Sequence, residues 1–198
     1  MTLSGAPTVA AVLLAAGGST RMGEPKQLIQ VGGRSLVQHA SDVALRSQCA
    51  ALFVVAGAAC DAIRSELADL PAVVVVAEDW REGLSRSIRC GVDAVSRSAD
   101  PAFDAVLLLL ADQPEITPAH LDAVMDLYRT NASAMVATLY AGSVGAPAVF
   151  GRRHFAALHA LEGDRGAKTL LLGEPAAGRV PFAKAALDID TPGDLPPA

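Results

Sequence analysis

The sequence predicts a three-layer α/β/α fold of the Rossmann-like type, with a mostly parallel central sheet. Short runs of Val, Leu and Ile alternate with longer amphipathic stretches, which is the order of strands and helices in βαβ units. The runs are apolar throughout, as expected of strands that helices cover on both faces. A length of 198 residues suits one domain with a substantial core and is short for two.

Five apolar runs are expected to form the strands. They lie at residues 9–15, 51–56, 72–77, 105–110 and 134–139. Between them, the length of each stretch and the spacing of its apolar residues predict helices. These lie at residues 35–48, 60–69, 87–96 and 118–129. Thr117 and Pro118 are typical of an N-cap and a first-turn proline, so the last of these helices should begin there.

After residue 140 the regular alternation gives way to a segment rich in Gly and Pro. Helices are expected at residues 152–161 and 167–172, and short extended pieces near Arg179 and Ala186. No repeat or low-complexity linker divides the sequence. We therefore expect one domain over residues 1–198, with residues 1–7 and 196–198 flexible.

Composition and charge argue against several classes of function. The apolar runs reach about eight residues, whereas a membrane-spanning helix needs about 20. The first residues lack the basic start and long apolar stretch of a secretory signal, so a cytoplasmic location is expected. The net charge is −5 without a run of Lys or Arg, which argues against nucleic acid as a partner. Three cysteines without a C-x-x-C pair argue against a disulfide framework or a zinc site. The chain is expected to be a monomer.

A segment suited to phosphate binding follows the first predicted strand directly. It opens with the small residues Ala15, Ala16, Gly17, Gly18 and Ser19. Small residues let backbone N–H groups come within hydrogen-bonding distance of an anion. Arg21 and Lys26 then offer a planar fork and a point charge to phosphate oxygens. The spacing of its glycines matches neither a P-loop nor the G-x-G-x-x-G motif. The alternative to a phosphate-binding segment is a surface turn with solvated cations.

Two aspartates are candidates for a magnesium site. Asp112 directly follows the predicted strand at residues 105–110, and Asp190 is the proposed distant partner. Mg²⁺ binds one or two carboxylates together with phosphate oxygens and water. Taken alone, Asp112 could form a turn before Pro114, and Asp190 could cap a short helix.

Two further glycine-containing segments are candidates for the site. Gly83, Ser85 and Ser87 follow the third predicted strand, so their N–H and hydroxyl groups could bind a base or ribose, or could cap a helix. Residues 163–168 precede a short apolar helix and could instead be a loop with solvated charges. The histidines show no ligand spacing. The segment at residues 83–87 is not the G-x-S-x-G elbow, and no His or Asp is placed to complete a triad, so a serine hydrolase is not expected.

Together these motifs resemble the signature of the MobA-like nucleotidyltransferases. The first segment reads Leu14-Ala15-Ala16-Gly17-x-Ser19-x-Arg21-Met22-Gly23, then Pro25-Lys26. The later matches are Trp80-x-x-Gly83-Leu84-Ser85-x-Ser87, Asp112-Gln113-Pro114, Gly145-x-Pro147-x-x-Phe150, Gly163-Asp164-x-Gly166-Ala167-Lys168 and Asp188-Ile189-Asp190-Thr191-Pro192. Within that superfamily the chain most resembles the molybdenum cofactor cytidylyltransferases, because the guanylyltransferase branch tends to have Gly at the position of Ala16.

The resemblance implies a Rossmann-like nucleotidyltransferase that uses Mg²⁺ and transfers CMP from CTP to the phosphate of molybdopterin, with release of pyrophosphate. It implies that Asp112 and Asp190 hold the metal. Gly83, Ser85 and Ser87 would lie on the base side. The acceptor would meet Gln113, Asp164 and Gly166, with His154 lining its pocket. A molybdenum hydroxylase or its chaperone is the expected protein partner.

Three alternatives remain open at this point. The acceptor could be another phosphorylated compound, such as a sugar phosphate. The chain could instead be an accessory protein for molybdenum enzymes, or an oxidoreductase of the nicotine-blue type. Because both Asp112 and Asp190 are present, a transferase is favoured over a relative that only binds.

Overall fold

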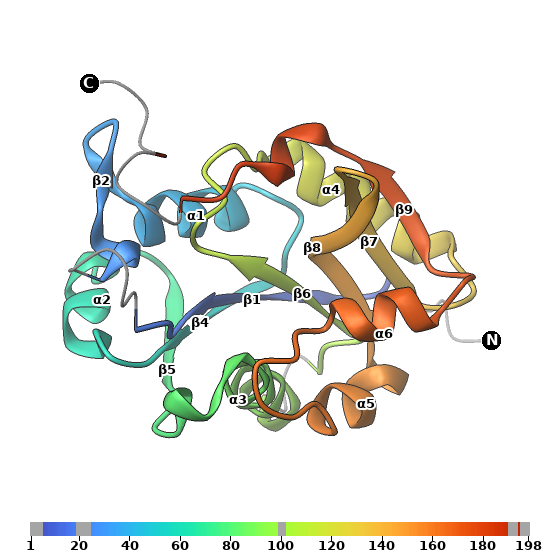
Figure 1. Ribbon diagram of the computed structural model, residues 1–198, viewed down its shortest axis with the longest axis horizontal. Coiled ribbons are helices and arrows are strands. Elements are labelled where there is room, and N and C mark those ends of the chain that lie inside the picture. The colour runs from blue at the N-terminus through green and yellow to red at the C-terminus, as the bar shows by residue number, and fades with distance from the viewer. Residues whose placement is uncertain (1–5, 19–24, 99–101, 190–193, 195–198) are drawn as a thin grey trace.

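A seven-stranded sheet lies at the centre of the computed structural model, which describes residues 6–18, 25–98, 102–189 and 194 (Figure 1). Its strands are β1 (Val9–Ala15), β4 (Ala51–Ala56), β5 (Ala72–Val76), β6 (Ala105–Leu110), β7 (Met135–Tyr140), β8 (Ser143–Gly151) and β9 (Gly178–Pro181). Their order across the sheet is β5-β4-β1-β6-β8-β7-β9. The ladders are parallel except where β8 pairs with β6 and with β7. The predicted fold class is therefore confirmed.

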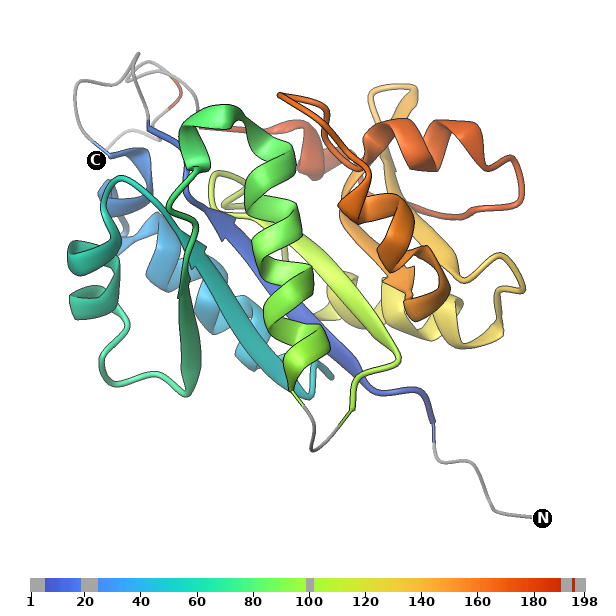
Figure 2. The same ribbon diagram turned by 90° about the horizontal axis from the view of Figure 1, so that it is seen from below.

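Helices cover both faces of the sheet (Figure 2). The α-helices are α1 (Leu36–Leu45), α2 (Cys60–Glu66), α3 (Leu84–Arg97), α4 (Pro118–Thr130), α5 (Phe155–His159) and α6 (Lys168–Gly173). Short 3-10 helices are η1 (Lys26–Leu28), η2 (Trp80–Glu82), η3 (Arg152–His154) and η4 (Ala183–Ala186), and β2 (Gln30–Val31) pairs with β3 (Arg34–Ser35) in a small hairpin. Helices α1, α2 and α4 pack on one face, and α3, α5 and α6 on the other. None of the described helices is long and apolar enough to cross a membrane.

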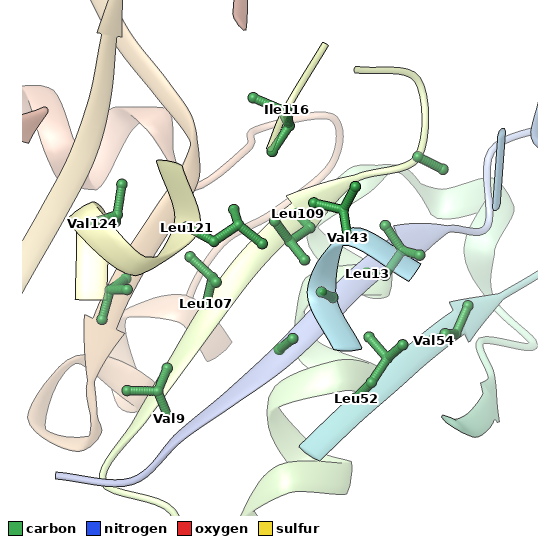
Figure 3. Packing of buried hydrophobic residues seen from close by; sticks show 14 of the residues in the cluster. Val9, Leu13, Val43, Leu52, Val54, Leu107, Leu109, Ile116, Leu121 and Val124 are labelled. Atoms are coloured by element: carbon green, nitrogen blue, oxygen red, sulfur yellow. The ribbon is translucent and has the colours of Figure 1, made fainter. Parts of the chain in front are cut away.

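The core is divided by the sheet into two clusters of buried side chains. Every residue of β1 is buried, because β4 and β6 flank it and helices cover both of its faces. Val9 and Leu13 point into the cluster beneath α1 and α4, as Figure 3 shows. Val12 points to the other side, where a Cβ on Gly91 of α3 would come within 2.3 Å of its Cγ1. A glycine at this position therefore lets α3 lie close to the sheet.

The first two thirds of the chain follow the prediction closely. The runs at residues 9–15, 51–56 and 105–110 have the predicted bounds, β5 ends one residue earlier than predicted, and β7 is shifted by one residue at both ends. Helix α4 begins at Pro118, and the side-chain oxygen of Thr117 accepts a hydrogen bond from the backbone N–H of His120 at 3.2 Å. Helix α3 begins at Leu84, three residues earlier than predicted.

The last third departs from the prediction in two places. Strand β8 was expected as an irregular segment, because Gly145 and Pro147 disfavour a regular ladder. Gly145 leaves room for the Tyr140 side chain, since a Cβ would lie 2.2 Å from its hydroxyl oxygen, and the register with β7 shifts between Ala137 and Thr138. The extended piece expected near Ala186 is wrong, because these residues form η4.

Candidate functional site

A cavity of about 430 Å³ opens at the carboxyl ends of β1 and β6. Ligands of open α/β sheets bind beyond the carboxyl ends of the strands, so this is the expected edge. The lining residues come from the ends of both strands, from η1 and η2, from the start of α3 and from the loop before α6. Of the residues predicted for the site, Ala16, Gly17, Gly18, Lys26, Gly83, Ser87, Asp112 and Asp164 line it.

Lys26 and Asp112 meet at the wall of this cavity. Asp112 follows β6, and Lys26 is the first residue of η1. The Lys26 Nζ lies 2.5 Å from Oδ2 of Asp112, with 22% and 16% of the two side chains exposed. The other carboxylate oxygen, Oδ1, is buried and accepts no hydrogen bond from the described part of the chain. Residues 86 positions apart in sequence thus place opposite charges together at a ligand-sized space.

The backbone of Gly17 and Gly18 is fixed by two side chains that sequence reasoning did not single out. The buried Gln27 donates a hydrogen bond from Nε2 to the Gly17 carbonyl at 2.8 Å. The Trp80 ring packs on Gly18, where a Cβ would come within 2.7 Å of two ring carbons. Trp80 belongs to one of the family motifs, but the motif alone assigns it no role. Ala15 is buried behind this wall, and Ser19 and Arg21 lie outside the described residues.

The start of α3 forms a further part of the cavity lining, in contact with the loop before α6. Gly83 is the N-cap of α3 with φ of +111°, and a Cβ there would lie 2.4 Å from the backbone of Gly163. The Ser85 N–H donates to the Gly163 carbonyl at 3.1 Å. Ser87 lines the cavity, whereas the Ser85 side chain is 1% exposed and lies behind it. Two motifs distant in sequence therefore form one wall.

A second, smaller cavity of about 150 Å³ adjoins the first and shares Leu14, Leu84 and Leu110 with it. Gly166 and Tyr140 are among its lining residues. Burial, and then the Asp188 carboxylate, raise the pKa of the Tyr140 hydroxyl, so it stays protonated and able to donate a hydrogen bond at neutral pH.

Gln113 contacts η4 rather than the first cavity. Its side chain is buried, and Nε2 donates to the Ala185 carbonyl at 2.8 Å. The Ile189 N–H donates to the Asp112 carbonyl at 2.9 Å, which brings the segment before Asp190 next to Asp112. Asp190 itself lies outside the described residues.

His154 lies elsewhere in the molecule. It ends η3, directly after β8, whose Gly151 pairs with Ala105 at the start of β6. That edge of the sheet is opposite the one that carries Asp112. The His154 Nε2 forms a hydrogen bond with the Ser133 carbonyl at 2.7 Å, so the imidazole has a local structural partner. This placement does not fit the prediction that His154 lines an acceptor pocket, and His154 is not part of the site.

Asp112 has the properties of a ligand for a hard divalent cation. Its Oδ1 is a buried carboxylate oxygen without a hydrogen-bond donor among the described residues, and such an oxygen gains from a cation. The described residues contain no group of three or more His, Cys, Asp or Glu that could hold a metal by itself. A Mg²⁺ ion that shares its coordination with nucleotide phosphates needs only one or two protein carboxylates.

Comparisons with known proteins identify a family for the chain. A family model described as "MobA-like NTP transferase domain" matches residues 11–178. Nicotine blue oxidoreductase of Paenarthrobacter nicotinovorans is 30% identical over 85% of this chain and 84% of its own length. Purine catabolism protein PucB of Bacillus subtilis is 29% identical over 94% of this chain and 93% of its own. The crystal structure of Rv0371c from Mycobacterium tuberculosis superposes with a TM-score of 0.82 at 31% identity, covering 96% of both chains, and a further structure of Rv0371c is a complex with manganese.

Proposed function

This chain belongs to the MobA-like NTP transferase family, and from that premise we propose that it transfers CMP from CTP to the phosphate of a molybdopterin-type acceptor. The observation that carries the proposal is the contact between Lys26 and Asp112 beside the Gly17 and Gly18 backbone, at a cavity of nucleotide-binding size. The choice of CTP rests on Ala16, where the guanylyl branch tends to have Gly. The choice of acceptor rests on the family resemblance.

The proposed reaction is an in-line attack by the acceptor's phosphate on the α-phosphorus of the nucleotide, with pyrophosphate as the leaving group. No covalent intermediate with the protein is needed, so catalysis comes from positioning and charge neutralisation. The backbone N–H groups at Gly17 and Gly18 and the cation of Lys26 would bind phosphate oxygens. Arg21 is proposed as a second cation.

Asp112, with Asp190 as its proposed partner, would hold Mg²⁺. When bound, Mg²⁺ would neutralise part of the negative charge of the phosphate oxygens and orient them. The Rv0371c complex with manganese supports a divalent ion in a similar fold. Lys26 contacts Oδ2 of Asp112, whereas the buried Oδ1 has no hydrogen-bond donor among the described residues and would gain from a bound Mg²⁺.

The second cavity is the proposed acceptor subsite. Its leucines, Phe150 and Tyr140 suit a flat ring system with polar edges, and Lys168 at its wall suits a phosphate. Asp164 lines the first cavity and Gly166 the second, so this loop contributes to both. Gln113 would act from behind, by fixing η4.

The test is an assay of pyrophosphate release with purified protein, Mg²⁺ or Mn²⁺, each nucleoside triphosphate in turn, and molybdopterin with or without molybdenum. Release that requires both CTP and the pterin is the expected result. Release with another nucleotide would replace CTP but retain the transferase.

An oxidoreductase is the second candidate function, because a curated relative 30% identical to this chain is nicotine blue oxidoreductase. The same preparation should therefore be examined for bound flavin and for nicotinamide-dependent reduction of quinone-like dyes. Redox activity without pyrophosphate release from any nucleotide would favour this candidate over the transferase.

A further inference from the structure

Trp80 packs where the ends of two neighbouring strands meet. Gly18 follows β1, and Gly57 directly follows β4, which is paired with β1. A Cβ on Gly57 would lie 2.7 Å from Cγ of Trp80, and a Cβ on Gly18 would lie 2.7 Å from the far end of the same ring. The ring therefore fits a slot that two glycines leave open. The ring is half-buried, with Gly57 at one end and Gly18 at the other.

Arg81 lies on this ring. Its guanidinium carbon is 4.6 Å from the centre of the Trp80 ring, and both residues line the 430 Å³ cavity. Stacking on an indole holds an arginine in place while leaving its N–H donors available. Arg81 is exposed and forms no ion pair with any residue that the structure describes.

The charges around the cavity give this arginine a role. The charged lining residues among those described are Lys26, Arg81, Asp112 and Asp164. Lys26 is in contact with Asp112, so Arg81 is the lining cation whose charge no described carboxylate neutralises at close range. A nucleoside triphosphate carries several negative charges and is attracted by such a cation.

We infer that Arg81 is a phosphate-binding residue of the nucleotide site and that Trp80 is the positioning residue that holds it. The inference rests on the function proposed above. Arg81 lies on the Trp80 ring, which packs against Gly57 after β4 and Gly18 after β1, whereas Asp112 follows β6, the other neighbour of β1. Both charged side chains line the same cavity, so a triphosphate bound at the Gly17 and Gly18 backbone could meet both.

Calorimetric titration with CMP, CDP and CTP in the presence of Mg²⁺ tests the role of Arg81. Arg81→Gln should weaken CTP binding at least tenfold and change CMP binding less than twofold, because only a contact with the outer phosphates distinguishes the two ligands. Arg81→Lys should recover part of the loss, since it keeps the charge without the planar fork. Arg179→Gln, at an exposed position of β9, is the matched control and should bind like the unmodified chain.

Trp80 is tested with two substitutions and with its own fluorescence. Trp80→Phe keeps an aromatic face for Arg81 and should retain the preference for CTP over CMP, whereas Trp80→Leu should lose it nearly as Arg81→Gln does. Because the chain contains one tryptophan, its emission reports this position alone. CTP should change the emission of the unmodified protein more than CMP at saturation.

The outcomes separate this inference from the proposed function. If the unmodified chain binds CTP and Arg81→Gln binds it equally well, or loses CMP and CTP affinity in equal measure, the phosphate role of Arg81 is wrong while the transferase stands. If Trp80→Leu behaves like Trp80→Phe, the positioning role of Trp80 is wrong. If the unmodified chain binds none of ATP, CTP, GTP and UTP in the presence of Mg²⁺, both the proposed function and the role of Arg81 are overturned.

Discussion

At the scale of single residues, Lys26 and Asp112 show how a functional contact differs from an ordinary surface ion pair. The exposed pair of Lys184 and Glu115 has a similar length, 2.7 Å, yet 66% and 42% of those side chains are in contact with solvent. Such exposed pairs contribute little to stability. The pair at the cavity is largely shielded, so each charge there acts more strongly on a ligand.

Replacement of Lys26 should therefore affect turnover much more than folding. We expect Lys26→Ala to lower kcat/KM for the nucleotide by roughly 100-fold, the magnitude typical of removing one group that stabilises a transition state. Pyrophosphate release measured over a range of CTP concentrations gives this number. Lys184→Ala removes an equivalent charge away from the cavity and should leave kcat/KM unchanged. Near-normal turnover of Lys26→Ala at saturating CTP would contradict the assignment.

His120 is a buried titratable group with a structural role. Its Nε2 lies 2.8 Å from the Thr138 hydroxyl, and that hydroxyl donates to the Pro147 carbonyl at 2.7 Å. Since the hydroxyl hydrogen is used by the carbonyl, His120 must be the donor to Thr138. The ring also stacks on Phe182 at 4.2 Å between centroids. This chain of contacts joins α4 to β7, β8 and the segment before η4.

The pH dependence of stability should follow from His120. Burial lowers its pKa from 6.5 to about 4, so the folded chain keeps the ring neutral where the unfolded chain protonates it. The contribution of the neutral His120 ring to the free energy of unfolding is fully present above pH 6.5. It is lost as the pH falls toward 4, and the free energy of unfolding falls by up to about 3 kcal/mol. Urea unfolding of the unmodified chain and of His120→Gln at several pH values measures the difference. Between pH 6.5 and 4 the free energy of unfolding should fall more steeply for the unmodified chain than for His120→Gln, and parallel slopes would refute the prediction.

At the scale of elements, the sequence predicts best what depends on local pattern. Strands β1, β4 and β6 are uniform apolar runs in the middle of the sheet, and their bounds were predicted correctly. Strand β8 could not be predicted in this way, because its Gly145 is explained only by the Tyr140 hydroxyl that packs against it from β7. A side chain from another strand thus determines what the local pattern cannot show.

Gly83, at the start of α3, should tolerate substitution less well than Gly142. Gly83 has a positive φ and also touches the Gly163 backbone, whereas a Cβ added to Gly142, with φ of +71°, would meet nothing within 4 Å. Gly142→Ala should therefore cost only the left-handed conformation, about 1–2 kcal/mol. Gly83→Ala should cost more and should also weaken nucleotide binding, since the loop that carries Asp164 must move. Unfolding curves and CTP titrations of both variants make the comparison, and equal behaviour would exclude the proposed contact between the two loops.

At the scale of the whole molecule, the fold brings together segments that the sequence only names separately. The small residues after β1 and the aspartate after β6 could be predicted as neighbours, because the carboxyl ends of adjacent parallel strands share one edge. The sequence gives no comparable rule for Gln27 and Trp80, whose contacts with Gly17 and Gly18 depend on how η1 and η2 fold back over the sheet. The predicted placement of His154 in the acceptor pocket does not fit the structure for the converse reason. Strand β8 runs antiparallel to β6, so the end of β8 lies at the edge of the sheet opposite Asp112.

Binding of nucleotide and metal should be visible in the stability of the entire chain. A ligand at 100 times its Kd stabilises the folded state by about 2.7 kcal/mol. For a chain of this size each kcal/mol raises Tm by about 2–4 °C, so CTP with Mg²⁺ should raise Tm by about 5–10 °C. Asp112→Asn keeps the side-chain shape but weakens the metal ligand, and should lose most of the part that depends on Mg²⁺. Glu115→Gln, which removes an exposed carboxylate three residues away, should behave like the unmodified chain. An equal shift with and without Mg²⁺, or in Asp112→Asn, would show that the ion does not bind at Asp112.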